Sequence, residues 1–139
     1  MNKGLIFIVD FGLVKKHLTQ EGFPKEERKF AEFRGTVPYA SLNAHNNHDL
    51  GRRDDLWSFY FVILEFLNEY LPWKINLPRN EIKDLKEQWI SGDIRWQVRK
   101  KDLPQLKNIF EHLKSLEYQS MPNYDLILNE LEDLRCITR

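Results

Sequence analysis

The sequence is short of cysteine and of long apolar runs, and these shortages exclude several classes of protein. Cys136 is the only cysteine, so neither an internal disulfide bond nor a cysteine-based zinc site can form within the chain. The longest apolar runs, Leu5–Val9 and Phe59–Leu64, are far below the roughly 20 residues that a membrane-spanning helix requires. The N-terminus is also too brief for a secretory signal with its cleavage site. We therefore expect a protein of the cytoplasm, with the nucleus as the alternative, that makes no contact with a membrane.

A net charge is lacking too. The 139 residues contain 21 lysines and arginines against 21 aspartates and glutamates, which leaves no long-range field to attract nucleic acid or an anionic membrane. Hydrophobic residues make up 42% of the chain and aromatic residues 13%, enough for a folded core. The composition therefore predicts one compact domain, or a large piece of one, with no nucleic-acid partner.

Regular structure is predicted unevenly along the chain. Leu5–Val9 is a short β-branched and aromatic run between a turn and Asp10-Phe11-Gly12, as expected of a buried strand. From Gly12 to about Arg53 the sequence keeps neither a helical nor an alternating period, and so long a connection is usually functional or disordered. A lone strand cannot satisfy its edge hydrogen bonds, so it pairs either within this stretch or with elements outside the chain.

The remainder predicts about four helices. Asp54-Asp55 precede the run Leu56–Asn68, whose apolar residues occupy almost the whole circumference, which is typical of a helix buried inside its domain. Three peripheral helices follow, over Glu81–Ile90, from about Leu103 to Leu116, and from Pro122-Asn123 onward. The predicted fold class is therefore mainly α, with one or two short strands.

Asp10-Phe11-Gly12 is the candidate for chemistry because it directly follows the predicted strand. A carboxylate fixed there can hold magnesium, which prefers oxygen ligands and uses few protein carboxylates, against nucleotide phosphates. Phe11 is expected to anchor in the core, and Gly12 permits backbone angles that let the segment move. In protein kinases this triplet has that role. Alone it is weak evidence, since an Asp-Gly spacing after a strand is more often just a turn.

The residues downstream make the signal specific. The sequence continues with FRGTVPYASLNAH at 33–45, GRRDDLWS at 51–58, Leu-Pro-Trp at 71–73 and Pro-Asn-Tyr at 122–124. With Asp-Phe-Gly-Leu at 10–13, this ordered series resembles the C-terminal lobe of the casein kinase 1/tau-tubulin kinase family of eukaryotic protein kinases. In that family Ser-Ile/Val-Asn replaces the Ala-Pro-Glu of most kinases, and here Ser41-Leu42-Asn43 stands at that place. The Arg-Gly-Thr-Val, Asn-Ala-His and Asp-Asp-Leu-Trp-Ser pieces favour the tau-tubulin kinase branch.

The resemblance covers essentially the whole chain and implies a partial kinase domain over residues 1–139. Its parts are the Asp-Phe-Gly strand with a long activation segment (5–53), a buried central helix (about 54–69) and peripheral helices (77–139). In a full-length form such a domain would use ATP and Mg²⁺ to phosphorylate serine or threonine of a protein substrate.

The resemblance also implies roles for individual residues. Asp10 would be the magnesium ligand, within the cofactor-binding triplet that includes Phe11 and Gly12. Thr36 would support catalysis by hydrogen bonding to the general base and lysine of the catalytic loop, although its other interpretation is a turn residue after glycine. Asp55 would accept hydrogen bonds from the catalytic-loop backbone, rather than act only as a helix N-cap, and Trp57 belongs to the same structural motif.

Several parts of the catalytic machinery do not occur in this sequence. It contains no glycine-rich loop, no phosphate-binding lysine on a strand and no His-Arg-Asp loop with its general base, which together supply most of the electrostatic stabilisation in kinases. We therefore expect the isolated chain to be inactive and to bind neither ATP nor Mg²⁺ tightly. Pro38 also replaces an arginine that helps the family bind an anion or a phosphorylated priming residue, so a preference for primed substrates is in doubt.

Two other functional classes compete with a kinase fragment. One is a non-catalytic, kinase-derived module that binds proteins, and the other is an unrelated helical protein with chance matches. His45 and His48 are expected to be solvated loop residues rather than metal ligands. Because Leu5–Val9 and the central helix would face elements outside the chain, we expect exposed apolar surface, marginal stability and a protein partner that covers this surface.

Overall fold

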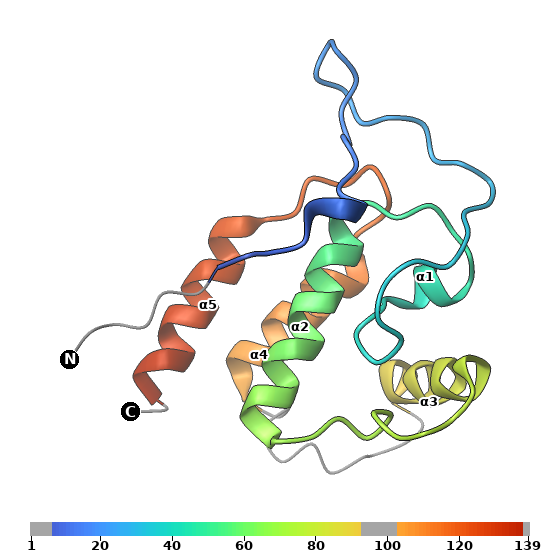
Figure 1. Ribbon diagram of the computed structural model, residues 1–139. Coiled ribbons are helices and arrows are strands. Elements are labelled where there is room, and N and C mark those ends of the chain that lie inside the picture. The colour runs from blue at the N-terminus through green and yellow to red at the C-terminus, as the bar shows by residue number, and fades with distance from the viewer. Residues whose placement is uncertain (1–6, 93–102, 138–139) are drawn as a thin grey trace.

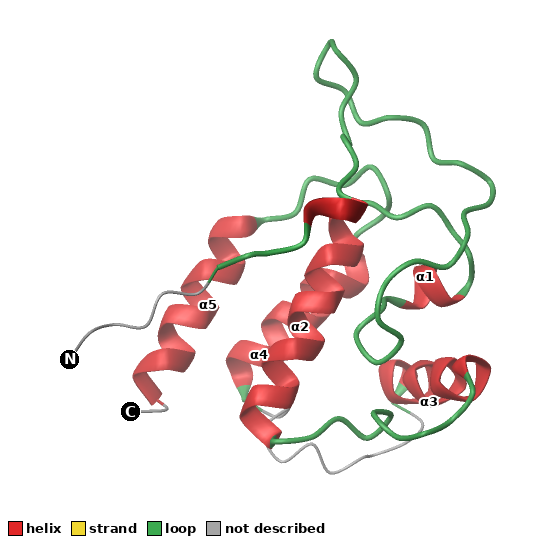
Figure 2. Cartoon of the chain, in the orientation of Figure 1, coloured by secondary structure: helices red, strands yellow, loops and turns green. Residues whose placement is uncertain are grey.

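The computed structural model describes residues 7–92 and 103–137, which form a predominantly helical structure (Figure 2). A 3₁₀ turn at Phe11–Leu13 is followed by a long loop. Five helices come next: α1 (Leu42–His45), α2 (Arg52–Asn68), α3 (Arg79–Ser91), α4 (Pro104–Ser115) and α5 (Tyr124–Ile137). The prediction of a mainly α fold is confirmed.

Helix α2 is the central element, with α4 beside it and α5 packed on α4, while the short α1 lies against α3 (Figure 1). The start of α2 differs from the predicted one. The helix begins at Arg52, because Gly51 is its N-cap and the Asp54 carboxylate accepts a hydrogen bond from the Gly51 N–H at 2.8 Å. A carboxylate in the first turn also stabilises the helix, because its negative charge lies at the positive end of the helix dipole.

The three later helices agree with their predicted positions to within two residues. Helix α3 ends at Ser91 and is followed by its C-cap Gly92, whose φ of 86° lies in the left-handed region that glycine adopts without strain. The four-residue α1 was not predicted; Ser41 caps it by accepting a hydrogen bond from the Ala44 N–H.

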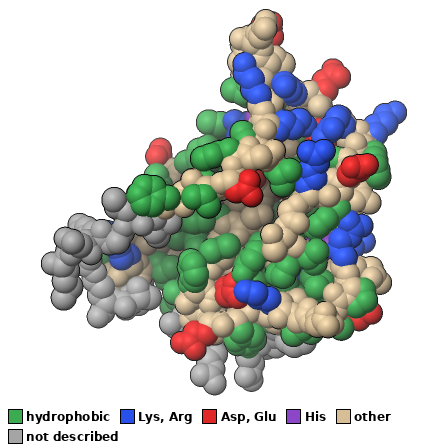
Figure 3. Space-filling view, viewed as in Figure 1, with side chains coloured by type: hydrophobic (Ala, Val, Ile, Leu, Met, Phe, Trp, Pro, Cys, Tyr) green, Lys and Arg blue, Asp and Glu red, His purple; other side chains and the backbone are tan. Residues whose placement is uncertain are grey.

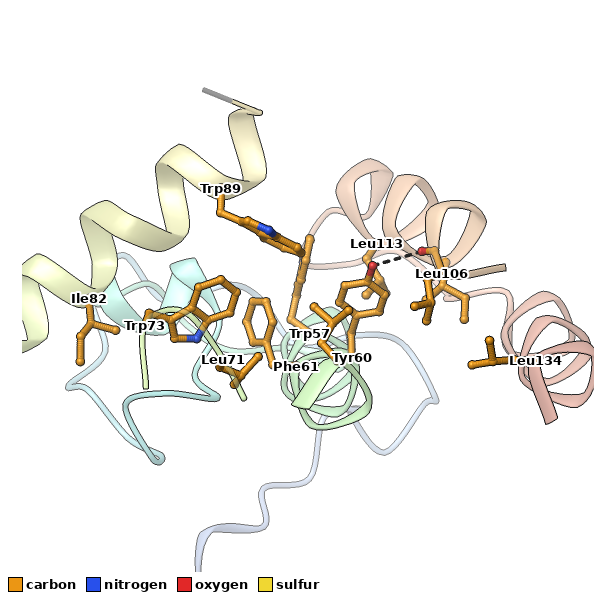
Figure 4. Packing of buried hydrophobic residues seen from close by; sticks show 12 residues of the cluster. Trp57, Tyr60, Phe61, Leu71, Trp73, Ile82, Trp89, Leu106, Leu113 and Leu134 are labelled. Carbon is orange, nitrogen blue, oxygen red and sulfur yellow. Dashed lines mark hydrogen bonds between the residues drawn. The ribbon is translucent and has the colours of Figure 1, made fainter. Parts of the chain in front are cut away.

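An aromatic cluster forms the core between α2, α3 and α4 (Figure 4). The Trp73 ring lies 5.2 Å from the Phe61 ring and 5.3 Å from the Trp89 ring, both at steep interplanar angles. Such edge-to-face pairs add to the free energy gained by burying the rings. The Tyr60 hydroxyl donates a hydrogen bond to the Leu106 carbonyl at 3.2 Å, which satisfies its polar end and joins α2 to α4. Trp57, singled out in the sequence, is also buried in this cluster.

The predicted strand at Leu5–Val9 is wrong for the part that the structure describes. Residues 7–9 have no regular structure, and Ile8 is 83% exposed. Phe11, expected in the core, is 67% exposed. The reason is the absence of a pairing strand. Within residues 7–92 and 103–137 the only β-type pairing is an isolated bridge between Leu18 and Pro24, so nothing there satisfies the edge hydrogen bonds of residues 7–9.

Exposed apolar residues are therefore concentrated in this N-terminal stretch, as the sequence predicted; Val9, Leu13 and Val14 are also mostly exposed. Among the helices of the described residues, none combines the length and the apolar character needed to cross a membrane.

Candidate functional site

Three of the residues singled out in the sequence lie on one cavity. Asp10, Thr36 and Asp55 come from the start of the chain, the long loop and helix α2, and all three line a cavity of about 970 Å³ together with Gly12. Lys and Arg side chains gather on this face beside the long loop (Figure 3). Phe11 and Trp57 do not line the cavity: Phe11 faces solvent and Trp57 is buried in the core.

Asp10 adopts an unusual backbone conformation at the cavity edge. Its φ of 65° and ψ of 76° lie in the left-handed region, which costs free energy for a residue with a side chain and recurs at functional sites. The Gly12 N–H donates to Asp10 Oδ1 at 3.3 Å. A Cβ atom at Gly12 would come within 3.2 Å of that oxygen, so glycine leaves the carboxylate free of crowding.

A single exposed carboxylate fits one position in a magnesium shell. Magnesium is usually held by one or two protein carboxylates, with substrate phosphates and water completing the octahedron. Within residues 7–92 and 103–137, no group of three or more His, Cys, Asp or Glu side chains is placed to hold a metal ion. One carboxylate at the cavity edge is thus compatible with a magnesium ion whose other ligands are nucleotide phosphates and water.

The two adjacent carboxylates at the start of α2 have different surroundings. Asp54 is 3% exposed and accepts hydrogen bonds from Ser41 Oγ at 2.6 Å and Asn43 Nδ2 at 2.8 Å, besides the Gly51 N–H. Asp55 is exposed to the cavity and makes no hydrogen bond within the part of the chain that the structure describes. Desolvation, then the charge of Asp54, raises the pKa of Asp55. The buried carboxylate is thus Asp54, whereas Asp55 is free to accept hydrogen bonds from a group that enters the cavity.

Asp49 holds the long loop against the helices, a role that sequence reasoning missed. Its carboxylate, 2% exposed, accepts from Lys15 Nζ at 3.1 Å and from Arg28 Nη2 at 2.7 Å. The Tyr118 hydroxyl, beyond α4, lies 3.4 Å away. The hydrogen bonds from Arg28 hold the pKa of Asp49 well below its usual range. We call Asp49, Lys15, Arg28 and Tyr118 the Asp49 cluster.

His45 is buried, so its prediction as a solvated loop residue is wrong, whereas His48 is exposed as expected. The Nε2 of His45 lies 3.3 Å from the Nζ of Lys86, a lysine on α3 with no exposed surface. Burial and the adjacent charge of Lys86 lower the pKa of His45 to about 4, and Arg79 and Lys83 act in the same direction. His45 is therefore neutral at physiological pH, with its Nε2 facing the Nζ of Lys86.

The titration of His45 predicts an acid-dependent loss of stability. An unfolded histidine has a pKa of 6.5 and the folded one about 4, so the unfolded state binds more protons between these values and stability falls as pH falls through that window. Between pH 7 and pH 4.5 the natural chain should lose about 2 to 3 kcal/mol more in free energy of unfolding than the His45→Gln variant, at 1.36 kcal/mol per pKa unit. Urea titrations at each pH measure this difference. The matched variant His48→Gln should retain the full loss; equal slopes for all three proteins would contradict the assignment.

Comparison with known proteins supports the resemblance carried by the motifs. No family model matches the sequence. A probable serine/threonine-protein kinase of Dictyostelium discoideum is 38% identical over 132 residues, which cover 94% of this chain and 26% of that protein. Casein kinase I homolog 3 of Saccharomyces cerevisiae is 31% identical, covering 93% of this chain and 26% of that protein. An inactive tau-tubulin kinase of Caenorhabditis elegans is 32% identical, covering 88% of this chain and 43% of that protein.

The chain thus spans between about a quarter and less than half of the length of these curated relatives. The similarity extends over nearly the whole chain, and the helical fold agrees with that of a kinase C-terminal lobe. The predicted family resemblance is confirmed: this chain is related to the serine/threonine protein kinases of casein kinase 1 and tau-tubulin kinase type.

Proposed function

We propose that this chain forms the magnesium-binding and substrate-facing part of a serine/threonine protein kinase domain that uses ATP. The observation that carries the proposal is the convergence of Asp10, Thr36 and Asp55 on one cavity from three separate segments. Phosphoryl transfer depends mainly on positioning and charge neutralisation. In this proposal Asp10 holds the metal, which supplies charge neutralisation for the phosphates when bound, and Asp55 fixes a backbone segment that carries the general base.

Thr36 has a suitable position for the supporting role proposed for it. It is exposed in the cavity wall, and its carbonyl accepts from the N–H groups of Tyr39 at 2.9 Å and Ala40 at 3.0 Å. These bonds fix the backbone so that the side chain is available to a group in the cavity. The hydroxyl can then orient a base and a lysine contributed by other residues of a complete domain.

A chimeric kinase tests the proposal. Residues 7–139 would replace the matching segment of the yeast casein kinase I homolog, and transfer of labelled phosphate from ATP to a protein acceptor would be measured. The chimera should be active, and Asp10→Ala should lower kcat at least about 100-fold, because it removes a metal ligand that acts in the transition state. The isolated 139-residue chain should show no activity above its own Asp10→Ala variant.

A matched control separates loss of chemistry from loss of folding. Asp125 lies in the first turn of α5 and is exposed, so the Asp125→Ala chimera should retain activity within about twofold. A chimera that is folded, as judged by circular dichroism, but inactive would contradict the proposal.

The second candidate function is a non-catalytic module that binds a protein through its apolar surface. Two observations favour it: the N-terminal stretch from Phe7 to Val14 is largely apolar and exposed, and one relative is named an inactive tau-tubulin kinase. An exposed apolar patch of this kind is typical of an interaction site. An inactive but folded chimera would support this alternative.

A further inference from the structure

The loop Val37–Ala40, next to Thr36, is attached to the helical body through its carbonyl groups. Lys86 Nζ donates to the Val37 carbonyl at 2.9 Å and to the Ala40 carbonyl at 2.6 Å. Between them, Trp73 Nε1 donates to the Pro38 carbonyl at 2.8 Å. Backbone acceptors that would otherwise need water are therefore satisfied by side chains from outside the loop.

The environment of Lys86 is complete in itself. An ammonium group has three N–H donors, and three polar atoms lie within reach of Lys86 Nζ: the two loop carbonyls, which accept from it, and His45 Nε2 at 3.3 Å. The group also lies 4.9 Å from the centre of the Phe61 ring and 5.8 Å from that of Trp73, where ring faces attract a cation. A lysine with no exposed surface is rare unless it is paired, so this arrangement indicates a specific role.

We propose that Lys86 is a positioning residue, which holds the Val37–Ala40 loop in the shape that receives the acceptor segment of a protein substrate. The proposal rests on the proposed kinase function, because that function places the acceptor beside Thr36. Lys86 does not touch the substrate; it acts through the loop carbonyls. Because Lys86 lies on α3 and donates to two carbonyls of the loop, helix α3 holds the loop conformation through contacts among the described residues.

Lysine is the side chain that this position requires. Methionine would fill a similar volume but would leave two carbonyls without donors, each an unfavourable buried group. Arginine would bring a larger, planar group into an enclosed space with at most three acceptors for five N–H donors. Lys83, on the same helix, has a side chain that is 31% exposed and pairs with Glu87 at 4.0 Å. It therefore provides a control for substitutions on α3.

Amine acylation of the natural 139-residue chain tests the enclosure of Lys86 directly. Burial lowers the pKa of Lys86 to about 7, so an accessible amine here would react faster than an ordinary lysine. The structure predicts the reverse: with an N-hydroxysuccinimide ester at pH 7, peptide mass spectrometry should find Lys86 labelled at least about tenfold more slowly than Lys83. Labelling of Lys86 at the rate of Lys83 or faster would overturn the proposal.

Hydrogen exchange tests the effect on the loop. In Lys86→Met the amides of Tyr39 and Ala40, which bond to Thr36, should exchange at least about tenfold faster than in Lys83→Met, while amides of α4 stay unchanged. Loop exchange within twofold of the control would overturn the proposal. If Lys86→Met does not fold, the acylation rates of the natural chain decide.

The acceptor role is measured in the chimeric kinase. Lys86→Met should raise KM for an acceptor peptide about tenfold and leave KM for ATP unchanged, a separation that general destabilisation would not produce. Equal changes in both constants would overturn the acceptor role. A parent chimera that folds but is inactive would instead refute the proposed function, and the labelling and exchange results would still decide whether Lys86 fixes the loop.

Discussion

Trp73→Ala is expected to cause the largest loss of stability, about 3 to 5 kcal/mol in free energy of unfolding, as is typical of buried tryptophan. Trp73 has no exposed surface and contacts the rings of Phe61 and Trp89. The substitution removes these contacts, opens a cavity beside Lys86 and leaves the Pro38 carbonyl without its donor. Since whole domains have only about 5–15 kcal/mol of stability, the variant should lose a large fraction of its stability and unfold at a much lower urea concentration than the natural chain.

Circular dichroism during urea titration measures this loss. Trp73→Phe retains most of the ring volume and should lose less than the alanine variant. Phe66→Ala is the surface control: Phe66 lies on α2 but is 79% exposed, so its removal should change the free energy by no more than about 0.5 kcal/mol. Similar losses at Trp73 and Phe66 would contradict the burial of Trp73 in the aromatic core.

The second large effect distinguishes two neighbouring aspartates. Asp54→Ala should lower the free energy of unfolding by about 3 kcal/mol, because it leaves the buried Ser41 hydroxyl, the Asn43 amide and the Gly51 N–H without their acceptor. Asp55→Ala should be neutral within about 0.5 kcal/mol, since it removes a side chain that is exposed in the cavity and repelled by Asp54.

Thermal and urea unfolding of the two variants would be compared under identical conditions. In the chimeric kinase, Asp55→Ala should instead have a large effect on activity. It should abolish phosphate transfer in a folded protein, because the proposed partner of Asp55 is the catalytic-loop backbone. Equal stability losses for the two variants in the isolated chain would show that Asp55 is also a structural residue of this lobe.

The helices could be predicted from sequence because their signals are local. Periodic apolar residues, a proline after α2 and Gly92 after α3 act within a few residues of where they stand. The strand predicted at Leu5–Val9 is wrong for residues 7–9, because a strand depends on partners elsewhere in a protein and not on its local sequence alone. Helix α1 is too short to show a period at all.

Asp10 and Thr36 stand out in the sequence because they belong to motifs, and both line the same cavity; their roles there stay predictions. Asp49 gave no signal, because its partners Lys15 and Arg28 are far away in the sequence. Lys86 did give one that was overlooked: it shares the spacing i, i+4, i+7 with Ile82 and Trp89 and so lies on the apolar face of α3. A lysine in such a stripe indicates a buried cation with acceptors nearby.

The Asp49 cluster also divides the long loop into independent sections. Because Lys15 and Arg28 are joined to the same carboxylate, the stretch between them begins and ends at one point on the helical body. The entropic cost of closing such an excursion rises only slowly with its length. An insertion or deletion around Gly22, at the tip of this excursion, is therefore expected to leave Thr36 in place.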